Sequence, residues 1–321
     1  MAGRLIALLL LALAPVVVAA GAWIAFVEED DGGPFALVAA ADPARPAHAA
    51  PPEPEGEPSA PPETTGLDIS LAGVDAFHVH LRRSPSAGLV FDVESGEVLW
   101  RRHPLRVRSI ASLTKIMTAL LAVDEGRPGE PVRITQAALD YEGSAIGMLR
   151  KGTRVRFETL LNGLLIVSGN DAAIALATHL AGSEAAFVDE MNERAEQLGL
   201  RCTHFVSSHG LEPGNRSCAR DLAVLTRLAM RRARIRRIAA TEYAELPFPT
   251  KGGKLFLSGH NYLQRLDYPG AIGLKTGYTD EAGRCYVGVV RRGGRTLAVI
   301  LLNSRDPAKH APKLLNAAFR G

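Results

Sequence analysis

The segment S-I-A-S-L-T-K-I-M-T-A-L-L-A, residues 109–122, is largely apolar. This run predicts a helix over residues 110–125, with Ser109 as its N-terminal cap. Lys115 interrupts the run three positions after Ser112. On a helix, residues three apart lie side by side, with Cβ atoms about 5–6 Å apart. Burial lowers a lysine's pKa, and such a lysine can take the proton of a serine hydroxyl. The segment therefore predicts a nucleophile and its base. The alternative is an ordinary surface serine and lysine, because so short a pattern often occurs by chance.

A second polar feature follows an apolar stretch at residues 164–173, L-L-I-V-S-G-N-D-A-A. One interpretation is a turn between two helices, with Asn170 or Asp171 as the cap of the second helix. The other places the Ser168 hydroxyl and the Asn170 amide at a corner facing a cleft. There the two groups could relay a proton and hold a lysine or a substrate amide. Taken alone, this segment favours the simple turn.

A third feature is I-G-L-K-T-G-Y-T, residues 272–279. On a strand, Lys275 and Thr276 could bind a carboxylate through charge and a hydroxyl. Gly277 beside them allows another backbone to approach closely. This arrangement suits a peptide that lies along a sheet edge as an added strand. The alternative is a turn with Gly277 at positive φ.

The three motifs occur in the order Ser-x-x-Lys, Ser-x-Asn, Lys-Thr-Gly, a combination found in serine β-lactamases and penicillin-binding proteins. Over residues 87–319 the chain resembles the D-alanyl-D-alanine carboxypeptidases among the low-molecular-mass penicillin-binding proteins, the S11 peptidases. The blocks that carry the resemblance are A-S-L-T-K-I-M-T-A-L-L-A, S-G-N-D-A-A-I-A-L-A, M-N-E-R-A-E-Q-L-G-L-R-C-T-H-F with a following H-G-L, A-R-D-L-A, and L-K-T-G-Y-T-D-E-A-G. Ser-Gly-Asn-Asp in place of Ser-Asp-Asn favours carboxypeptidases over class A β-lactamases.

The resemblance implies a catalytic role for three side chains. Ser112 would be the acylated nucleophile, Lys115 its base and Ser168 a proton shuttle. Asn170 would hold Lys115 and the substrate amide. No cofactor is implied.

The resemblance also implies a binding role for the third motif. Lys275 and Thr276 would hold the terminal carboxylate of the substrate. Gly277 would allow close approach, and the backbone N–H of Tyr278 would form an oxyanion hole with that of Ser112.

Two further matches are weaker. His209 and Gly210 match the His-Gly-Leu loop at the edge of the cleft, in a supporting role. Arg305 is the best match for an arginine that helps to bind the carboxylate.

The implied activity is removal of the terminal D-alanine from peptidoglycan stem peptides through an acyl-enzyme that β-lactams also form. Three alternatives remain: a DD-endopeptidase acting on cross-links, a β-lactamase-like hydrolase, and a wall-binding or β-lactam-sensing domain that acylates without turnover.

The order of elements predicts the fold class independently. Strands are expected near both ends of the folded part, with helices between them, which favours an α+β fold. A mostly antiparallel sheet flanked by helices agrees with the β-lactamase/transpeptidase-like fold that the resemblance implies. The strands are expected at 87–92, 98–101, 286–291 and 296–302, and the helices at 110–125, 158–167, 171–180, 184–198, 219–233 and 307–319, with Ser217 as the cap of the helix at 219–233.

The N-terminal part predicts export. Residues 5–27 lack charge and would span about 34 Å as a helix, enough for a bilayer core of about 30 Å. Arg4 before the run and acidic residues after it place Met1 in the cytoplasm. The expected domains are a membrane anchor or signal at 1–31, a Pro/Ala/Glu-rich linker at 32–66 and a catalytic domain at 67–321. The protein is expected at the cell membrane with its catalytic domain outside the cytoplasm, or secreted if the segment is cleaved near Ala20.

Net charge and cysteine content bear on which partners, metal sites and disulfides to expect. A net charge of +3 over 321 residues does not indicate a nucleic-acid partner. His-Glu-x-x-His and Cys-x-x-Cys patterns are absent from the sequence, so no metal site is expected. Cys202 and Cys218 flank a polar loop and are the expected disulfide, and Cys285 is expected as a buried thiol. The alternative is three free buried thiols.

Overall fold

The structure of the protein, a computed structural model, describes residues 66–321. The expected anchor or signal at 1–31 lies outside the described residues, as does the expected linker except for its last residue. Within the described part, no helix combines the length and apolar character needed to cross a membrane.

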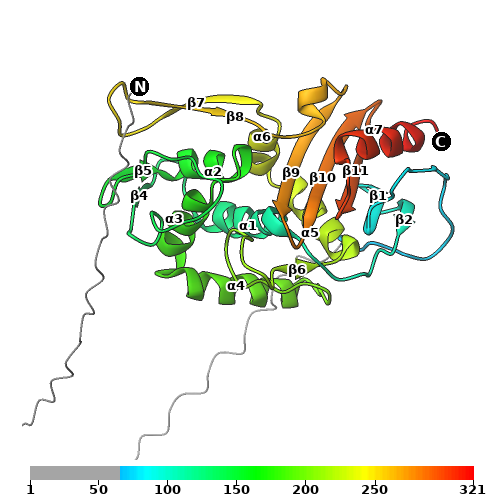
Figure 1. Cartoon of the computed structure of the whole chain (residues 1–321), viewed down its shortest axis with the longest axis horizontal. Coiled ribbons are helices and arrows are strands. Elements are labelled where there is room, and N and C mark those ends of the chain that lie inside the picture. The colour runs from blue at the N-terminus through cyan, green and yellow to red at the C-terminus, as the bar shows by residue number, and fades with distance from the viewer. Residues whose placement is uncertain (1–65) are drawn as a thin grey trace, which may run out of the picture. The chain divides into compact units, whose positions relative to one another are not determined.

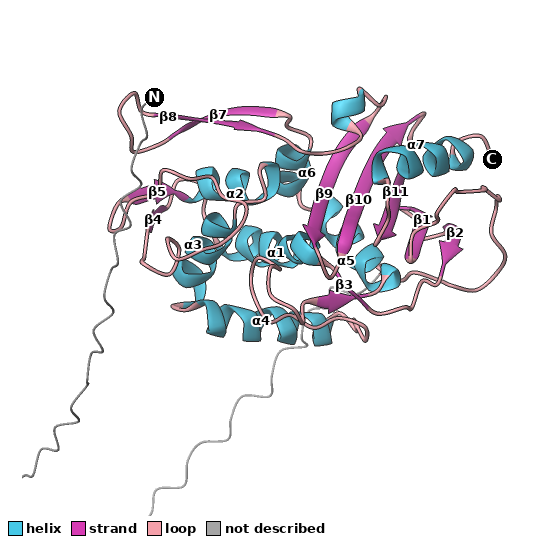
Figure 2. Cartoon of the chain, viewed as in Figure 1, coloured by secondary structure: helices cyan, strands magenta, loops and turns pink. Residues whose placement is uncertain are grey.

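A five-stranded antiparallel sheet forms one side of the domain, in the order β2-β1-β11-β10-β9 (Figures 1 and 2). Its first and last strands along the chain are neighbours, with Val90 opposite Val299. The two ends of the folded chain therefore build one sheet, as the sequence predicted. The strands are β1 (Ala87–Asp92), β2 (Val98–Arg102), β9 (Ala271–Thr279), β10 (Gly283–Arg292) and β11 (Arg295–Leu302).

Helices cover both faces of this sheet. Alternate side chains of β1 enter different apolar clusters: Leu89 and Phe91 join the larger one, and Val90 the smaller one beneath α7 (Pro307–Ala318). Burial on both faces explains why the strands are nearly continuous apolar runs. The larger cluster is shared with α1 (Lys115–Glu125), α2 (Phe157–Ile166), α3 (Asn170–Ala181), α4 (Glu184–Gln197), α5 (Ala219–Arg231) and α6 (Ala233–Ala239).

The helix predicted from residue 110 does not begin as an α-helix. A 3₁₀ turn, η1 (Ala111–Thr114), precedes α1. Ser109 lies in β3 (Arg108–Ser109) and donates its hydroxyl to Glu281 Oε1 at 2.7 Å, so its predicted role as a cap is wrong. The chain enters η1 from a strand pairing, and Ala111 takes a φ of +48°. This approach imposes the tight first turn.

Two other predicted caps are also wrong. Gly169 caps α3, so Asn170 and Asp171 lie within its first turn. Cys218 is the residue before α5, and Ser217 lies in β6 (Arg216–Ser217), where its hydroxyl bonds that of Thr203 at 2.8 Å. The expected cap residues lie at a corner within the helix in the first case and in a strand in the second, so neither caps its helix.

The sequence did not predict one hairpin, β7 (Tyr243–Pro247) with β8 (Lys254–Ser258). Two short strands lie between the first helix and residue 157, β4 (Pro131–Arg133) and β5 (Arg154–Arg156), and they pair antiparallel.

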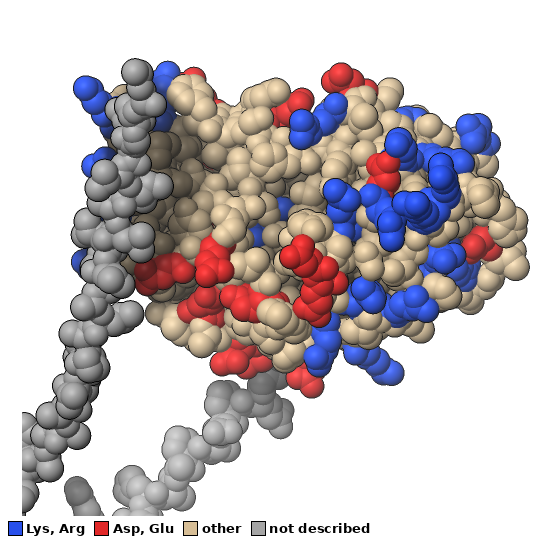
Figure 3. Space-filling model, in the orientation of Figure 1, with Lys and Arg blue, Asp and Glu red and all other residues tan. Residues whose placement is uncertain are grey.

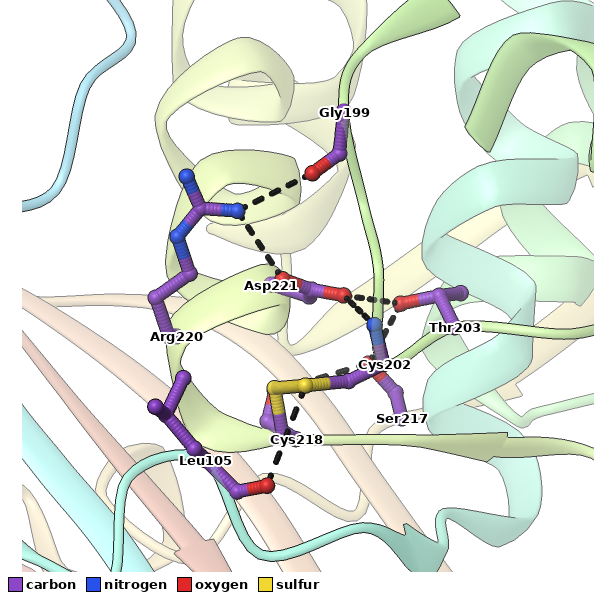
Figure 4. The surroundings of a disulfide bond; sticks show 8 residues. All are labelled: Leu105, Gly199, Cys202, Thr203, Ser217, Cys218, Arg220 and Asp221. Atoms are coloured by element: carbon purple, nitrogen blue, oxygen red, sulfur yellow. Dashed lines mark hydrogen bonds and ion pairs between the residues drawn. A yellow bond between two sulfur atoms is a disulfide. The ribbon is translucent and has the colours of Figure 1, made fainter. Parts of the chain in front are cut away.

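The expected disulfide joins Cys202 to Cys218 (Figure 4). As expected, Cys285 is free and buried. The Asp221 carboxylate accepts hydrogen bonds from the Cys202 N–H at 2.7 Å and the Thr203 hydroxyl at 2.9 Å. The bridge thus fastens the segment after α4 to the start of α5. It closes a loop that includes residues 207–215.

Candidate active site

Lys115 is fully buried at the start of α1, and its ammonium has three acceptors. The Nζ atom lies 3.2 Å from Ser112 Oγ, 2.7 Å from Asn170 Oδ1 and 2.7 Å from the carbonyl oxygen of His209. The predicted proximity of Ser112 and Lys115 is therefore confirmed, although a 3₁₀ turn rather than an α-helical turn brings them together.

Burial lowers the pKa of Lys115 well below its usual value, and the positive charge of Lys275 lowers it further. The negative charge of Asp171 acts in the opposite direction with a smaller effect. A lysine with a depressed pKa gives up its proton more readily than a solvated lysine, and its neutral form is a base. At 3.2 Å it can then accept the proton of Ser112 Oγ.

A second serine–lysine pair lies at the corner between α2 and α3. Lys275 Nζ on β9 donates to Ser168 Oγ at 2.8 Å and to the carbonyl oxygen of Thr276 at 2.9 Å. Lys275 is 2% exposed, and burial lowers its pKa to about 7. Ser168 has a φ of +62°, a region that residues with a side chain rarely occupy. The first and third motifs thus each contribute a buried lysine to one site.

Asn170 connects the site to the segment that covers it. Its Oδ1 accepts from Lys115, while its Nδ2 donates to the carbonyl oxygen of Glu142. The Asn170 N–H also donates to the carbonyl oxygen of Ser144 at 2.7 Å. These bonds confirm the predicted contact with Lys115 and fix the orientation of the amide.

Gly277 on β9 lies against the turn that carries Ser112. A Cβ atom at this position would stand 3.0 Å from the Ser112 backbone nitrogen and 3.1 Å from the Ile110 carbonyl oxygen. A side chain at residue 277 would therefore be tightly packed against the turn, and glycine lets the strand lie this close without that crowding. N–H groups in a first helical turn have no partner within the helix, so that of Ser112 is suited to bind an oxyanion.

The adjacent residues Tyr278 and Thr276 lie on either side of this contact. The Tyr278 side chain is 61% exposed, and its hydroxyl donates to Asp280 Oδ1 at 2.8 Å. Thr276 lines a small cavity with His260 and Asn261.

Residues 80–306 match the family model described as Peptidase S11, D-alanyl-D-alanine carboxypeptidase. The chain belongs to the peptidase S11 family. It is 39% identical over 217 residues to D-alanyl-D-alanine carboxypeptidase DacB2 of Mycobacterium tuberculosis, covering 67% of this chain and 73% of that protein. It is 34% identical over 248 residues to DacF of Bacillus subtilis, covering 74% of this chain and 63% of that protein.

A solved structure of a D-alanyl-D-alanine carboxypeptidase from Mycobacterium tuberculosis H37Rv superposes with a TM-score of 0.71 at 34% identity. It covers 78% of this chain and 97% of that one. A more distant relative is the D-alanyl-D-alanine endopeptidase of Escherichia coli, 28% identical over 225 residues, or 70% of this chain and 73% of that protein. The S11 chain therefore has relatives named for two activities, and it spans less than two thirds of the Bacillus protein.

Sequence reasoning about this S11 chain missed the role of Asp171. Its buried carboxylate accepts from the N–H groups of Ile146 and Gly147, both at 3.0 Å, and from Ala172 at 2.8 Å. Burial raises the pKa of Asp171, opposed by these three bonds. Asp171 thereby fastens residues 146 and 147 to the start of α3. Its position in Ser-Gly-Asn-Asp was the only available signal.

The loop with His209 and Gly210 was expected at the edge of the cleft in a supporting role, but the residue that holds it in place, Asn215, was missed. Asn215, which is 1% exposed, donates to Ser207 Oγ at 3.0 Å, and its own carbonyl accepts from the Ile110 N–H at 3.1 Å. The His209 ring lies 3.3 Å from Glu212 Oε1, and burial lowers its pKa. Nothing in the local pattern around Asn215 indicates this role.

The arginine that was expected to help bind the carboxylate does not join the motif side chains. Arg305 lines a pocket beside α7 that contains none of the motif side chains.

Within residues 66–321, one group of three potential metal ligands occurs, Cys202, Cys218 and Asp221, and its two sulfur atoms form the disulfide.

Proposed function

We propose that this S11 chain is a serine D-alanyl-D-alanine carboxypeptidase that removes the terminal D-alanine from peptidoglycan stem peptides. The observation that carries the proposal is the pair of buried serine–lysine contacts in one site, Ser112 with Lys115 and Ser168 with Lys275. The first pair provides a nucleophile and base. The second provides a positive charge and a hydroxyl next to them.

In the first step, Ser112 Oγ attacks the carbonyl carbon of the last peptide bond while its proton passes to neutral Lys115. The resulting oxyanion is held by the backbone N–H groups of Ser112 and Tyr278. The C–N bond then breaks, and Ser168 gives its proton to the departing amine of D-alanine. Lys115 then passes its proton to Ser168 and becomes neutral again.

In the second step, water attacks the acyl ester at Ser112 and gives a proton to Lys115. The ester bond breaks, Ser112 recovers its proton, and the shortened peptide leaves with a new carboxylate. Until D-alanine leaves, Lys275 and Thr276 hold its carboxylate, and the Asn170 amide holds Lys115 and the substrate amide. A β-lactam would acylate the same serine through opening of its ring amide.

We also propose that residues 67–321 form the catalytic domain and work outside the cytoplasm. Residues 1–31 would hold it at the membrane, or be removed as a signal, and residues 32–66 would be the tether. The absence of charge over residues 5–27 supports this arrangement.

Replacement of Ser112 by alanine should abolish covalent labelling of the full chain by a fluorescent penicillin, because the acylated oxygen is gone. Ser109→Ala is the matched control: this serine is three residues earlier and bonds Glu281. Labelling is read after denaturing electrophoresis. Persistent labelling of Ser112→Ala would remove Ser112 from the mechanism.

Product analysis distinguishes the carboxypeptidase from a DD-endopeptidase, which the Escherichia coli relative's name makes the second candidate. Mass spectrometry should detect loss of one D-alanine from a synthetic pentapeptide, with little cleavage of a cross-linked dimer. Dominant cleavage of the dimer would make the protein an endopeptidase. Preferred hydrolysis of a penicillin would indicate a β-lactamase, and one burst of acylation without turnover would indicate a sensor.

The pH dependence should report Lys275. Its pKa of about 7 means that the ammonium loses its proton as the pH rises through 7, and its attraction for a carboxylate is then lost. We expect kcat/KM for a pentapeptide to decline on the alkaline side of about pH 7, since this parameter follows the free enzyme. Lys275→Arg stays charged and should shift that decline to higher pH. An unchanged alkaline limb in Lys275→Arg would assign it to another group.

A further inference from the structure

A basic pocket of about 490 Å³ lies beside α7, separate from the serine–lysine site. This volume is within the range of small-molecule sites, about 300–1,000 Å³. Figure 3 shows Lys and Arg gathered on the half of this face where α7 lies in Figure 1. The residues that line the pocket are Leu81, Arg82, Arg83, Arg305, Asp306, Lys309, His310 and Lys313.

The charges in this basic pocket are unbalanced. Five side chains are arginine or lysine, and Asp306 is the one acidic residue in the lining. Asp306 is already used: its carboxylate lies 3.0 Å from Lys309 Nζ and accepts from the Lys309 N–H at 3.2 Å. Clefts lined by one sign of charge concentrate counter-ions.

The three arginines have free donors. Across residues 66–321, the guanidinium groups of Arg82, Arg83 and Arg305 have neither a hydrogen bond nor an ion pair, in contrast to those of Arg101 and Arg234. Each guanidinium offers five N–H donors in a rigid plane. A ligand in the pocket could therefore be bound without breaking an existing contact of these side chains.

The backbone beneath the arginines is fixed. His310 is 6% exposed, and its ring bonds Ser304 Oγ at 2.8 Å and the Arg82 carbonyl oxygen at 3.2 Å. The Arg305 carbonyl accepts from Arg284 at 3.3 Å. Arg83 adopts a φ of +55°, which is uncommon for a residue with a side chain. The arginines thus project from positions that are held in place.

We propose that the basic pocket binds a phosphate group. Its cationic side chains come from three separate segments, residues 82–83, residue 305 and α7, and all five are exposed to solvent, where a ligand can reach them. Arginine donors match phosphate well, and a tetrahedral phosphate accepts from several directions. A carboxylate presents two oxygens in one plane and would leave part of this set unused.

The phosphate could be a free ion or part of a phosphodiester polymer, and a titration separates the two. The full chain in a non-ionic detergent is titrated by calorimetry with inorganic phosphate, with a glycerol-phosphate oligomer, and with a glutamate oligomer of equal charge. The test variant is Arg82→Gln/Arg83→Gln/Arg305→Gln. The control is Arg133→Gln/Arg154→Gln/Arg156→Gln, which removes three exposed arginines from β4 and β5 at the other end of the domain (Figure 1).

We expect the parent and the control to bind a phosphate probe at least tenfold more tightly than the test variant, and more tightly than the glutamate oligomer. Binding of inorganic phosphate identifies a free-ion site, and binding of the oligomer alone identifies a polymer site. Equal losses in test and control variants, equal binding of glutamate, or no binding by the parent would overturn the proposal. Thermal unfolding of both variants verifies that they fold.

Discussion

Replacement of Lys115 by arginine should slow acylation by a fluorescent penicillin about 10³-fold, the usual scale of a lost general base. Arginine keeps the positive charge but cannot give up its proton, so it cannot accept one from Ser112. The measurement is the second-order acylation rate constant of the full chain at pH 7.

The matched control for this substitution is Lys251→Arg, which makes the same chemical change at an exposed position. It should acylate at the parental rate. Lys115 is fully buried among three acceptors, so thermal unfolding of Lys115→Arg is measured alongside. A folded variant that acylates within threefold of the parent would show that another group is the base.

Gly210→Ala should damage both stability and acylation. Gly210 has a φ of +83°, and a Cβ atom there would lie 2.1 Å from the Ala111 carbonyl oxygen and 2.6 Å from Thr114 Oγ1. These atoms belong to η1, the turn that carries Ser112. Strained φ and overpacking each cost about 1–3 kcal/mol, so we expect a loss of about 3 kcal/mol or more. At about 2–4 °C per kcal/mol, the unfolding temperature should fall by about 10 °C.

Gly182→Ala separates the cost of the strained φ from the cost of overpacking. Gly182 has a similar φ of +80°, but no atom lies within 4 Å of the position its Cβ would take. This variant should lose only about 1 kcal/mol and should acylate normally. If both variants unfold at the same temperature and acylate at the same rate, the close contact between residue 210 and η1 affects neither stability nor acylation.

The family of this chain and its sheet were predictable from local patterns. Apolar runs and turn residues predicted β1, β2, β10 and β11, because strand and hairpin signals depend on neighbouring residues. The hairpin of β7 and β8 was missed. Its strands carry exposed residues such as Tyr243 and Phe256, and the connection is longer than a two-residue turn.

The sequence by itself determined which side chains are available to the site. Spacing placed Lys115 one turn from Ser112, and the order of three motifs identified Ser168 and Lys275 as their companions. The tertiary structure decided what surrounds them. The carbonyl of His209 binds Lys115 from 94 positions away, and Ser168 meets Lys275 across 107 positions.

Only the tertiary structure also decided the chemistry of the two lysines. Their pKa values fall mainly because distant segments bury them. The prediction from residues 109–122 was correct about Ser112 and Lys115. It was wrong about Ser109, because a strand pairing with Arg216, and not a helix cap, fixes that residue. Side-chain periodicity is a local property that the sequence displays directly. Desolvation and hydrogen-bond partners depend on which remote backbone folds against a residue, and the linear pattern does not contain that information.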